Sequence, residues 1–218
     1  MRDGPPAHVR IIGQSVTWLV ARFPSTWALL RRPTARYFDR IAPEWHTRIG
    51  APDRMAPLAA AIELSGSEPT RILDLGTGTG AAALWLAKRY PEARVTGVDV
   101  AEEMIGLARG DVPAEDEDRI SFEVADAADL RFETGAFDLV VQVSAPAFFG
   151  ETARVLAPGG SLVIVSSRGT GTPFHTPVAL MRRGFEREGL EWVGEGAEGI
   201  GTYYVFRRPL RLGSAENY

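Results

Sequence analysis

The sequence has no cysteine and only three histidines among its 218 residues. Without cysteine, disulfide bonds, thiolate nucleophiles and sulfur-ligated metal centres are excluded. The three histidines, His8, His46 and His175, are too few and too scattered to suggest a histidine-based metal centre. We therefore expect no bound metal.

Long apolar runs and an excess of positive charge are also missing. No stretch approaches the roughly 20 apolar residues that span a bilayer, and the formal net charge is -4. A surface for nucleic acid or for an anionic membrane would call for a basic field. We therefore expect a cytoplasmic protein that neither binds nucleic acid nor inserts into a membrane.

The first part of the chain, residues 1–66, has the pattern of short helices rich in tryptophan. Pro24 and Pro33 predict breaks, so that separate helices are expected over about 26–32 and 34–41. This segment is expected to form a helical lid over the substrate or the surface of a homodimer. Simple packing against the flank of the main domain is the alternative.

In the second part, residues 67–210, short apolar strands alternate with helices, which predicts a parallel sheet. The last two strands have no helix between them, which predicts an antiparallel edge. The expected fold class is α/β, a doubly wound, mostly parallel seven-stranded sheet with an antiparallel C-terminal edge hairpin and an N-terminal helical lid. Residues 211–218 are expected to be a polar tail. The predicted strands are 71–75, 94–98, 120–124, 137–143, 161–166, 191–196 and 202–208.

A glycine-rich turn follows the first strand and opens a helix, in the run Asp74-Leu75-Gly76-Thr77-Gly78-Thr79-Gly80. An open parallel sheet places its ligand crevice at such a turn, where glycine lets a ligand approach the backbone. A P-loop is excluded because Ala81 and Ala82 stand where Lys and Ser or Thr are needed. The dinucleotide pattern G-x-G-x-x-G is disfavoured by the early Gly80, but spacing alone leaves it open.

Carboxylates at three successive strand ends favour an adenosine that carries a cation. Asp74 would repel a pyrophosphate, but it suits an α-ammonium group. Asp99 ends the second strand, where a carboxylate accepts hydrogen bonds from ribose hydroxyls. Asp126 follows the third strand and could accept a hydrogen bond from the adenine amino group. S-adenosyl-L-methionine has these groups and no phosphate.

At this point the chain, from about residue 70 to residue 208, resembles the Rossmann-like S-adenosylmethionine-dependent methyltransferases. A shorter likeness, over 37–45, is to the small-molecule subgroup that includes quinone C-methyltransferases. The resemblance rests on the segments LDLGTGTG (73–80), VTGVDV (95–100), Asp126-Ala127, FDLVV (137–141) and RVLAPGGSL (154–162).

The resemblance implies a role for each matching residue. The methionine part of the cofactor would be held by Asp74 and the turn residues Gly76, Thr77, Gly78 and Gly80. Asp99 would hold the ribose, with Val100 and Met104 beside the adenine. Asp126 and Ala127 would contact the adenine edge, and the backbone at Gln142 and Val143 would lie beside the cofactor's amino group.

The sequence departs from the family in two places. Ala101 stands where a Ser or Thr usually caps the helix after Asp99, so a side-chain cap worth about 1 kcal/mol is expected to be missing. The segment between Val143 and Pro158 is short, and no Asn-Pro-Pro-aromatic signature is present, which argues against methylation of nucleobase amino groups.

The expected reaction is an in-line displacement that moves a methyl group to a small-molecule acceptor. Such a reaction needs close alignment at about 3 Å, and it needs a base only if the acceptor must lose a proton. His175, His46 and Tyr37 are the candidates for that base or for a substrate contact, and surface or lid packing is the alternative for each. Two other functions remain open: a cofactor-binding module without catalysis, and a nicotinamide-dependent oxidoreductase.

Overall fold

A computed structural model describes residues 6–49 and 55–210, except for the side chains of residues 46–49. The tail predicted at 211–218 lies outside the described residues. The helices are α1 (Ala7–Arg22), α2 (Trp27–Ile49), α3 (Ala56–Ser65), α4 (Ala81–Arg89), α5 (Glu102–Gly110), α6 (Phe149–Val155) and α7 (Val178–Arg187). The strands are β1 (Arg71–Leu75), β2 (Arg94–Asp99), β3 (Ile120–Val124), β4 (Phe137–Val143), β5 (Leu156–Ser166), β6 (Glu191–Glu198) and β7 (Gly201–Arg207).

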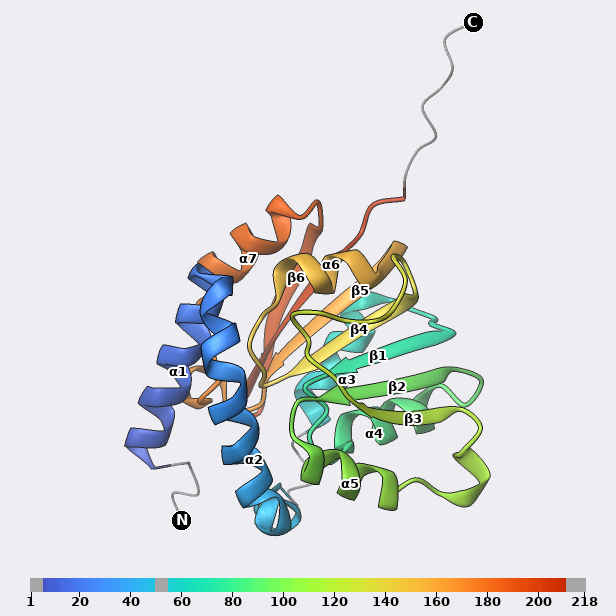
Figure 1. Ribbon diagram of the computed structural model, residues 1–218. Coiled ribbons are helices and arrows are strands. Elements are labelled where there is room, and N and C mark those ends of the chain that lie inside the picture. Colours follow the sequence, from blue (N-terminus) through green and yellow to red (C-terminus); the bar gives the residue numbers. More distant parts are fainter. Residues whose placement is uncertain (1–5, 50–54, 211–218) are drawn as a thin grey trace, which may run out of the picture.

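The strands form one seven-stranded sheet in the order β3-β2-β1-β4-β5-β7-β6 (Figure 1). Strands β1 to β5 pair in parallel, whereas β7 runs antiparallel to both β5 and β6. The predicted fold class, including the antiparallel hairpin, is confirmed. The order reverses between β1 and β4, and a sheet of this kind opens its ligand crevice at that point, beyond the carboxyl ends of the strands.

Helices cover both faces of the sheet and bury two apolar cores. On one face, α3, α4 and α5 contribute Ile62, Leu86 and Ile105. On the other face, α6 and α7 contribute Val155 and Phe185. Helices α1 and α2 lie together on one side of the molecule (Figure 1), outside both layers. No helix in the described ranges is long and apolar enough to cross a membrane.

The prediction of separate helices at 26–32 and 34–41 was wrong. Helix α2 runs without a break from Trp27 to Ile49 and contains both Pro33 and Pro43. Proline removes one amide donor from a helix, but both prolines are exposed, and the carbonyl left without a donor there can take water instead. The continuous helix is long enough to pass over several strand ends.

The start of β5 also differs from the prediction. The strand was expected from Ser161 but begins at Leu156, which pairs with Phe137 across an irregularity in the register. Pro158, Gly159 and Gly160 therefore lie within the strand, at this irregularity in its pairing with β4. The irregularity lies at the amino end of the strand, so it leaves the crevice end unchanged.

Candidate functional site

The glycine-rich turn joins β1 to α4, and its backbone requires glycine. Gly76, Gly78 and Gly80 have φ of 71°, 55° and 82°, the left-handed region that side chains disfavour. A Cβ atom on Gly76 would lie 2.6 Å from the Cβ of Ala145, whereas one on Gly78 would have only the Trp45 indole nitrogen within 4 Å, at 3.8 Å. The turn is therefore packed on its Gly76 side and open at Gly78.

The amides of this turn are already used within the protein. The Gly76 and Thr77 amides donate to the Val98 carbonyl at 2.9 and 3.0 Å, and the Gly80 amide donates to the Thr77 carbonyl at 3.0 Å. The Gly78 amide donates to Asp99 Oδ2 at 2.9 Å. Loops that bind phosphate direct free amides at the anion. This turn leaves few amides free, so its geometry disfavours a pyrophosphate.

Asp74 lies beneath the turn with one oxygen unsatisfied. Its side chain is 1% exposed, and Oδ2 accepts a hydrogen bond of 2.7 Å from the Thr77 hydroxyl. Oδ1 has no hydrogen-bond partner among the described residues. Burial raises the pKa of this carboxyl to about 6, and the Thr77 hydroxyl and the nearby Ala83 amide oppose that rise. A buried, unpaired carboxylate oxygen is costly, and a ligand ammonium would relieve that cost.

Asp99 connects the turn to the helix after β2. Its Oδ1 accepts from the Ala101 amide at 3.0 Å, and its Oδ2 accepts from Gly78. Burial raises the pKa of this carboxyl, and the nearby backbone amides of Ala101, Gly78 and Val100 oppose the rise. Nearby, Met104 is fully buried with Ala101 against Ala42 of α2. Ribose and adenine contacts at Asp99 and Met104 would therefore lie directly under α2.

Asp126, expected at the adenine edge, is held by three donors. Its Oδ1 accepts from the Trp27 indole nitrogen at 2.7 Å and from the Ala128 amide at 2.9 Å. Its Oδ2 accepts from the Arg31 guanidinium at 3.2 Å. Trp27 and Arg31 both belong to α2, so the N-terminal segment reaches the loop predicted to bind adenine.

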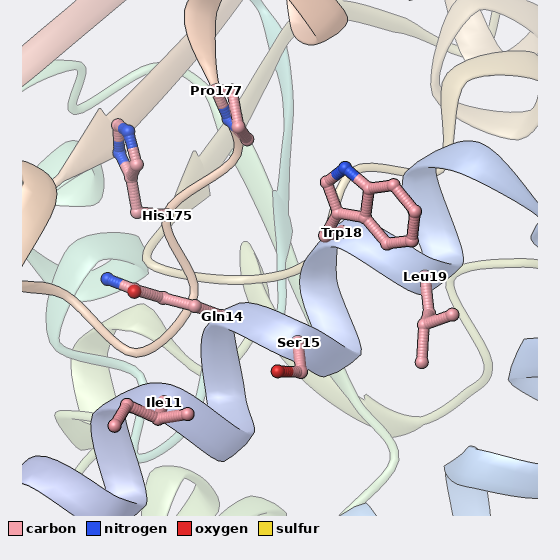
Figure 2. A pocket seen from close by; sticks show the side chains of 7 residues that line it. All are labelled: Ile11, Gln14, Ser15, Trp18, Leu19, His175 and Pro177. Carbon is pink, nitrogen blue, oxygen red and sulfur yellow. The ribbon is translucent and has the colours of Figure 1, made fainter.

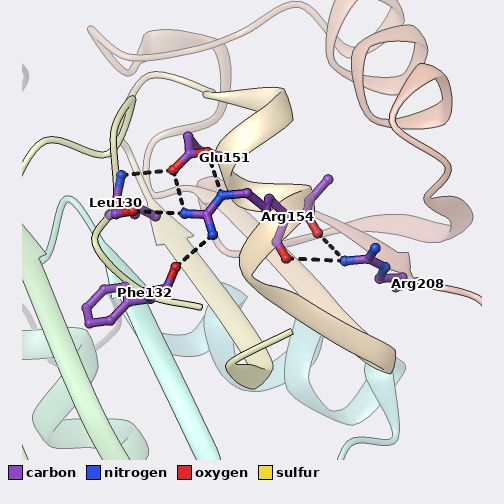
Figure 3. Close-up of polar contacts among 6 residues, drawn as sticks. Leu130, Phe132, Glu151, Arg154 and Arg208 are labelled. Carbon is purple, nitrogen blue, oxygen red and sulfur yellow. Dashed lines mark hydrogen bonds and ion pairs between the residues drawn. The ribbon is translucent and has the colours of Figure 1, made fainter. Parts of the chain in front are cut away.

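Arg154 holds the segment between β3 and β4 through hydrogen bonds to its backbone (Figure 3). The Arg154 guanidinium binds both carboxylate oxygens of Glu151, and it donates to the carbonyls of Leu130 and Phe132 at 2.8 and 2.7 Å. Glu151 also accepts from the Leu130 amide at 2.8 Å, and these hydrogen bonds lower the pKa of its carboxyl. The connection between β3 and β4 is thereby tied to α6.

The short segment after β4 is a hydrogen-bonded turn. The Gln142 side chain donates to the carbonyls of Ala145 and Pro146, and its own oxygen is buried without a partner among the described residues. Ser144 adopts a left-handed φ of 53°, and its hydroxyl accepts from the Ser167 amide at 3.1 Å. Strained residues of this kind concentrate at functional sites. The turn places Ala145 against Gly76, so it forms one wall of the crevice.

The three candidate base or substrate residues lie in different surroundings. His175 is half-buried, its Nδ1 has no partner in the described part of the chain, and burial lowers the pKa of its imidazole. Tyr37 is 38% exposed and packs edge-on against Phe38. Phe38 in turn packs against Phe174, so α2 meets the segment before His175. The His46 side chain lies outside the described residues.

A surface pocket of about 510 Å³ borders His175. Five of its lining residues come from α1, and His175 and Pro177 come from the segment before α7 (Figure 2). Gln14, one of the α1 residues, also donates to the carbonyls of Thr170 and Thr172 at 2.8 and 3.2 Å. Helix α1 is therefore bound to the loop that follows β5.

The sequence reasoning missed three residues of α2 at this crevice: Trp27, Asp39 and Trp45. Asp39 Oδ1 accepts from the Glu103 amide at 3.1 Å, in the first turn of α5. The missing Ala101 cap is confirmed, but α2 supplies a carboxylate in its place. Trp27, Phe38 and Trp45 share a helical spacing, and treating Pro33 as a helix end concealed it. No group of three or more potential metal ligands is found among the described residues.

Comparisons with known proteins agree with this geometry. A model of the methyltransferase domain matches residues 72–160. Over 138 residues, 60% of this chain and 51% of the relative, the sequence is 39% identical to a malonyl-[acyl-carrier protein] O-methyltransferase of Geobacter sulfurreducens. It is 40% identical over 140 residues to a demethylmenaquinone methyltransferase of Thermus thermophilus, covering 59% of this chain and 63% of the relative. The chain thus spans about half to two thirds of the length of these relatives.

Solved structures give the same fold at low sequence identity. An S-adenosylmethionine-dependent methyltransferase from Aquifex aeolicus aligns with a TM-score of 0.63 and 20% identity over 76% of this chain and 98% of that chain. The [4+2]-cyclase SpnF aligns with a TM-score of 0.66 and 17% identity, over 81% of this chain and 95% of that chain. One fold therefore carries more than one kind of chemistry.

Proposed function

Because the chain belongs to the Rossmann-like, class I methyltransferases, we propose that it binds S-adenosylmethionine and transfers the methyl group to a small-molecule acceptor. The observation that carries this proposal is the unpaired Oδ1 of Asp74, buried beneath the open turn at Gly78. A buried carboxylate with one oxygen free fits the α-ammonium group of an amino acid. It does not fit a phosphate.

The remaining residues fit the same group. Asp99 accepts one backbone amide on each oxygen and keeps a further lone pair on each for the ribose hydroxyls. Val100 and Met104 would flank the adenine, and Asp126 and Ala127 would face its edge. The turn residues Gly76 to Gly80 would enclose the methionine part, beside the backbone of Gln142 and Val143. When bound, S-adenosylmethionine supplies an electrophilic methyl group on a sulfonium centre.

The protein's own contribution is to position the acceptor and exclude water. Helix α2 covers the crevice at Trp45 and Phe38, and the turn after β4 closes the side next to Gly76. We propose that α1 and α2, within the segment 1–66, act as the lid, whereas α3 packs into the core under the sheet and belongs with residues 67–210 to the methyltransferase domain. His175 would be the acceptor contact, because burial lowers the pKa of its imidazole, which favours the neutral form, and its buried Nδ1 has no partner among the described residues.

The alternative is a protein that keeps the cofactor but catalyses no methyl transfer. The [4+2]-cyclase SpnF supports this alternative, because its structure has the same fold and its named reaction is a cyclisation. Calorimetric titration with S-adenosylhomocysteine tests cofactor binding, which both functions require. Assay of S-adenosylhomocysteine release with a panel of phenols, amines, carboxylates and quinols then separates them. Tight binding of NADH with none of S-adenosylhomocysteine would refute both.

A further inference from the structure

Helix α2 contacts the proposed cofactor site at three places. Trp27 lies at the loop after β3, Asp39 at the start of α5, and Trp45 beside the glycine-rich turn. Between them, Ala42 is fully buried against Ala101 and Met104. The helix is therefore docked along one face, and three of its side chains, Trp27, Arg31 and Asp39, make polar contacts with backbone or carboxylate groups of the site.

The first contact is the hydrogen bond from Trp27 to Asp126. The Trp27 side chain is only 4% exposed, and its ring packs edge-on against Phe148 at 5.1 Å. With Trp27 and Ala128 on Oδ1 and Arg31 on Oδ2, three of about four lone-pair directions of the carboxylate are taken. The remaining direction is on Oδ2. The lid thus fixes the orientation in which Asp126 could accept one further donor.

The second contact is the cap that Asp39 gives to α5. Ala101, at the cap position, has no side-chain acceptor, so the amides of the first turn would otherwise rely on water. Asp39 Oδ1 accepts from the Glu103 amide and also places a negative charge at the positive end of the helix. Glu102, Glu103 and Asp99 lie at the same helix start, and their negative charges repel the Asp39 carboxylate. Helix α5 carries Met104, so the cap links the lid to the predicted adenine wall.

We propose that Trp27 and Asp39 form a two-point latch that docks α2 on the adenosine half of the site, so that cofactor binding and lid docking strengthen each other. The coupling rests on the proposed function, whereas the latch itself does not. Trp27 and Asp39 are positioning residues, because they act through Asp126 and through α5. Thermodynamic linkage makes the effect reciprocal. A change that loosens the docking of the lid weakens cofactor binding, and bound cofactor protects the lid from opening.

The first experiment removes the Trp27 indole donor while keeping an aromatic ring, with Trp27→Phe in the full chain. S-adenosylhomocysteine affinity is measured by calorimetry, and amide hydrogen exchange is followed over residues 27–45 with and without that ligand. We expect about tenfold weaker binding, as for loss of a hydrogen bond to a charged group, and faster exchange of α2 in the free protein. Trp192→Phe makes the same change on β6 at the far edge of the sheet and should alter neither.

A double-mutant cycle with Asp126→Ala tests whether Trp27 acts through that carboxylate. In the Asp126→Ala background, Trp27→Phe should weaken binding by less than twofold, because the acceptor is already gone. An undiminished tenfold loss would overturn the latch. If Trp27→Phe folds poorly, Arg31→Gln is the milder variant, and the neighbouring Arg32→Gln is its control. Arg31→Gln should speed amide exchange of α2, whereas Arg32→Gln should not.

The second experiment replaces the cap. Asp39→Ala should weaken S-adenosylhomocysteine binding about fivefold, in line with a lost helix cap, and should speed exchange of both α2 and α5. Ala101→Ser gives α5 a local cap, so in that background Asp39→Ala should leave α5 exchange unchanged. Equal binding and exchange in wild type, Trp27→Phe and Asp39→Ala would refute the latch. If wild type does not bind S-adenosylhomocysteine, the proposed function and the coupling fail, while exchange in the free protein still tests the latch.

Discussion

The two halves of the crevice differ in how they are built. At the ends of β1, β2 and β3, the carboxylates Asp74, Asp99 and Asp126 are held by short hydrogen bonds from the turn, α5 and α2. At the ends of β4 and β5, Ser144 and His175 lie on connecting segments that contact α1 and α2, through the Gln14–Thr170 hydrogen bond and the Phe148–Trp27 and Phe174–Phe38 ring contacts. The first half offers the carboxylates that the proposed cofactor requires. The second is shaped by contacts that can vary without disturbing the fold, which suits an acceptor site.

The largest expected effect comes from Asp74→Asn, in the adenosine half. Removing the charge should weaken S-adenosylhomocysteine binding at least about a hundredfold, as for a lost charge-assisted hydrogen bond in a buried site. The free protein should be no less stable than wild type at pH 7, because keeping this carboxylate ionised in the fold costs roughly 3 kcal/mol. Calorimetry and thermal unfolding measure the two effects. Unchanged affinity would place the ammonium site elsewhere.

The next effect tests the tight packing of the glycine-rich turn at Gly76. Gly76→Ala requires a left-handed alanine with its Cβ 2.6 Å from that of Ala145, so we expect a loss of about 2 to 4 kcal/mol in unfolding free energy. Gly106→Ala is the matched control, since it lies exposed in α5 with open space around it, and it should gain up to about 1 kcal/mol. Chemical denaturation measures both. Equal stability of the two variants would contradict the packing at Gly76.

A pH titration sharpens the comparison further. The folded protein keeps the Asp74 proton up to about pH 6, whereas the unfolded chain releases it near its ordinary pKa of 3.8. This group therefore lowers the unfolding free energy as pH rises from about 4 to 6. Ligand binding needs the charged form, so affinity for S-adenosylhomocysteine should be about tenfold weaker at pH 5 than at pH 7. In Asp74→Asn both dependences should be reduced.

The smallest effect is expected in the acceptor half. His175→Ala should leave S-adenosylhomocysteine affinity within about twofold and reduce turnover of an identified acceptor about tenfold, with the loss relieved at higher pH if the imidazole takes a proton. Tyr37→Phe and His46→Ala, measured in the same assay, test the other two candidates. Full turnover in all three variants would remove each of them from the acceptor site.

The sequence predicted best where buried strands and strand ends decide the structure. The bounds of β1, β3 and β4 agree with the prediction, because strands of a parallel sheet covered on both faces are short apolar runs. The Asp74, Asp99 and Asp126 carboxylates meet at one edge because parallel strands end together. The roles predicted for these residues stay predictions until a ligand is bound.

The contacts of α2 could not be predicted in the same way. The helix continues through Pro33 and Pro43 because both are exposed, and exposure is a property of the tertiary structure. The Asp39 cap joins residues 64 positions apart, and the Trp27 hydrogen bond joins residues 99 apart. Local pattern carries no signal for such pairs. It did reveal that Ala101 lacked a cap, which is the gap that Asp39 fills.

The most direct test is a calorimetric titration of the full chain with S-adenosylhomocysteine at pH 7 and pH 5, beside Asp74→Asn and an NADH titration. We expect one saturable site per chain, about tenfold weaker binding at pH 5, at least about a hundredfold weaker binding by the variant, and no binding of NADH by the wild type. Binding that is indifferent to both pH and Asp74, or binding of NADH in place of S-adenosylhomocysteine, would contradict the proposed cofactor site.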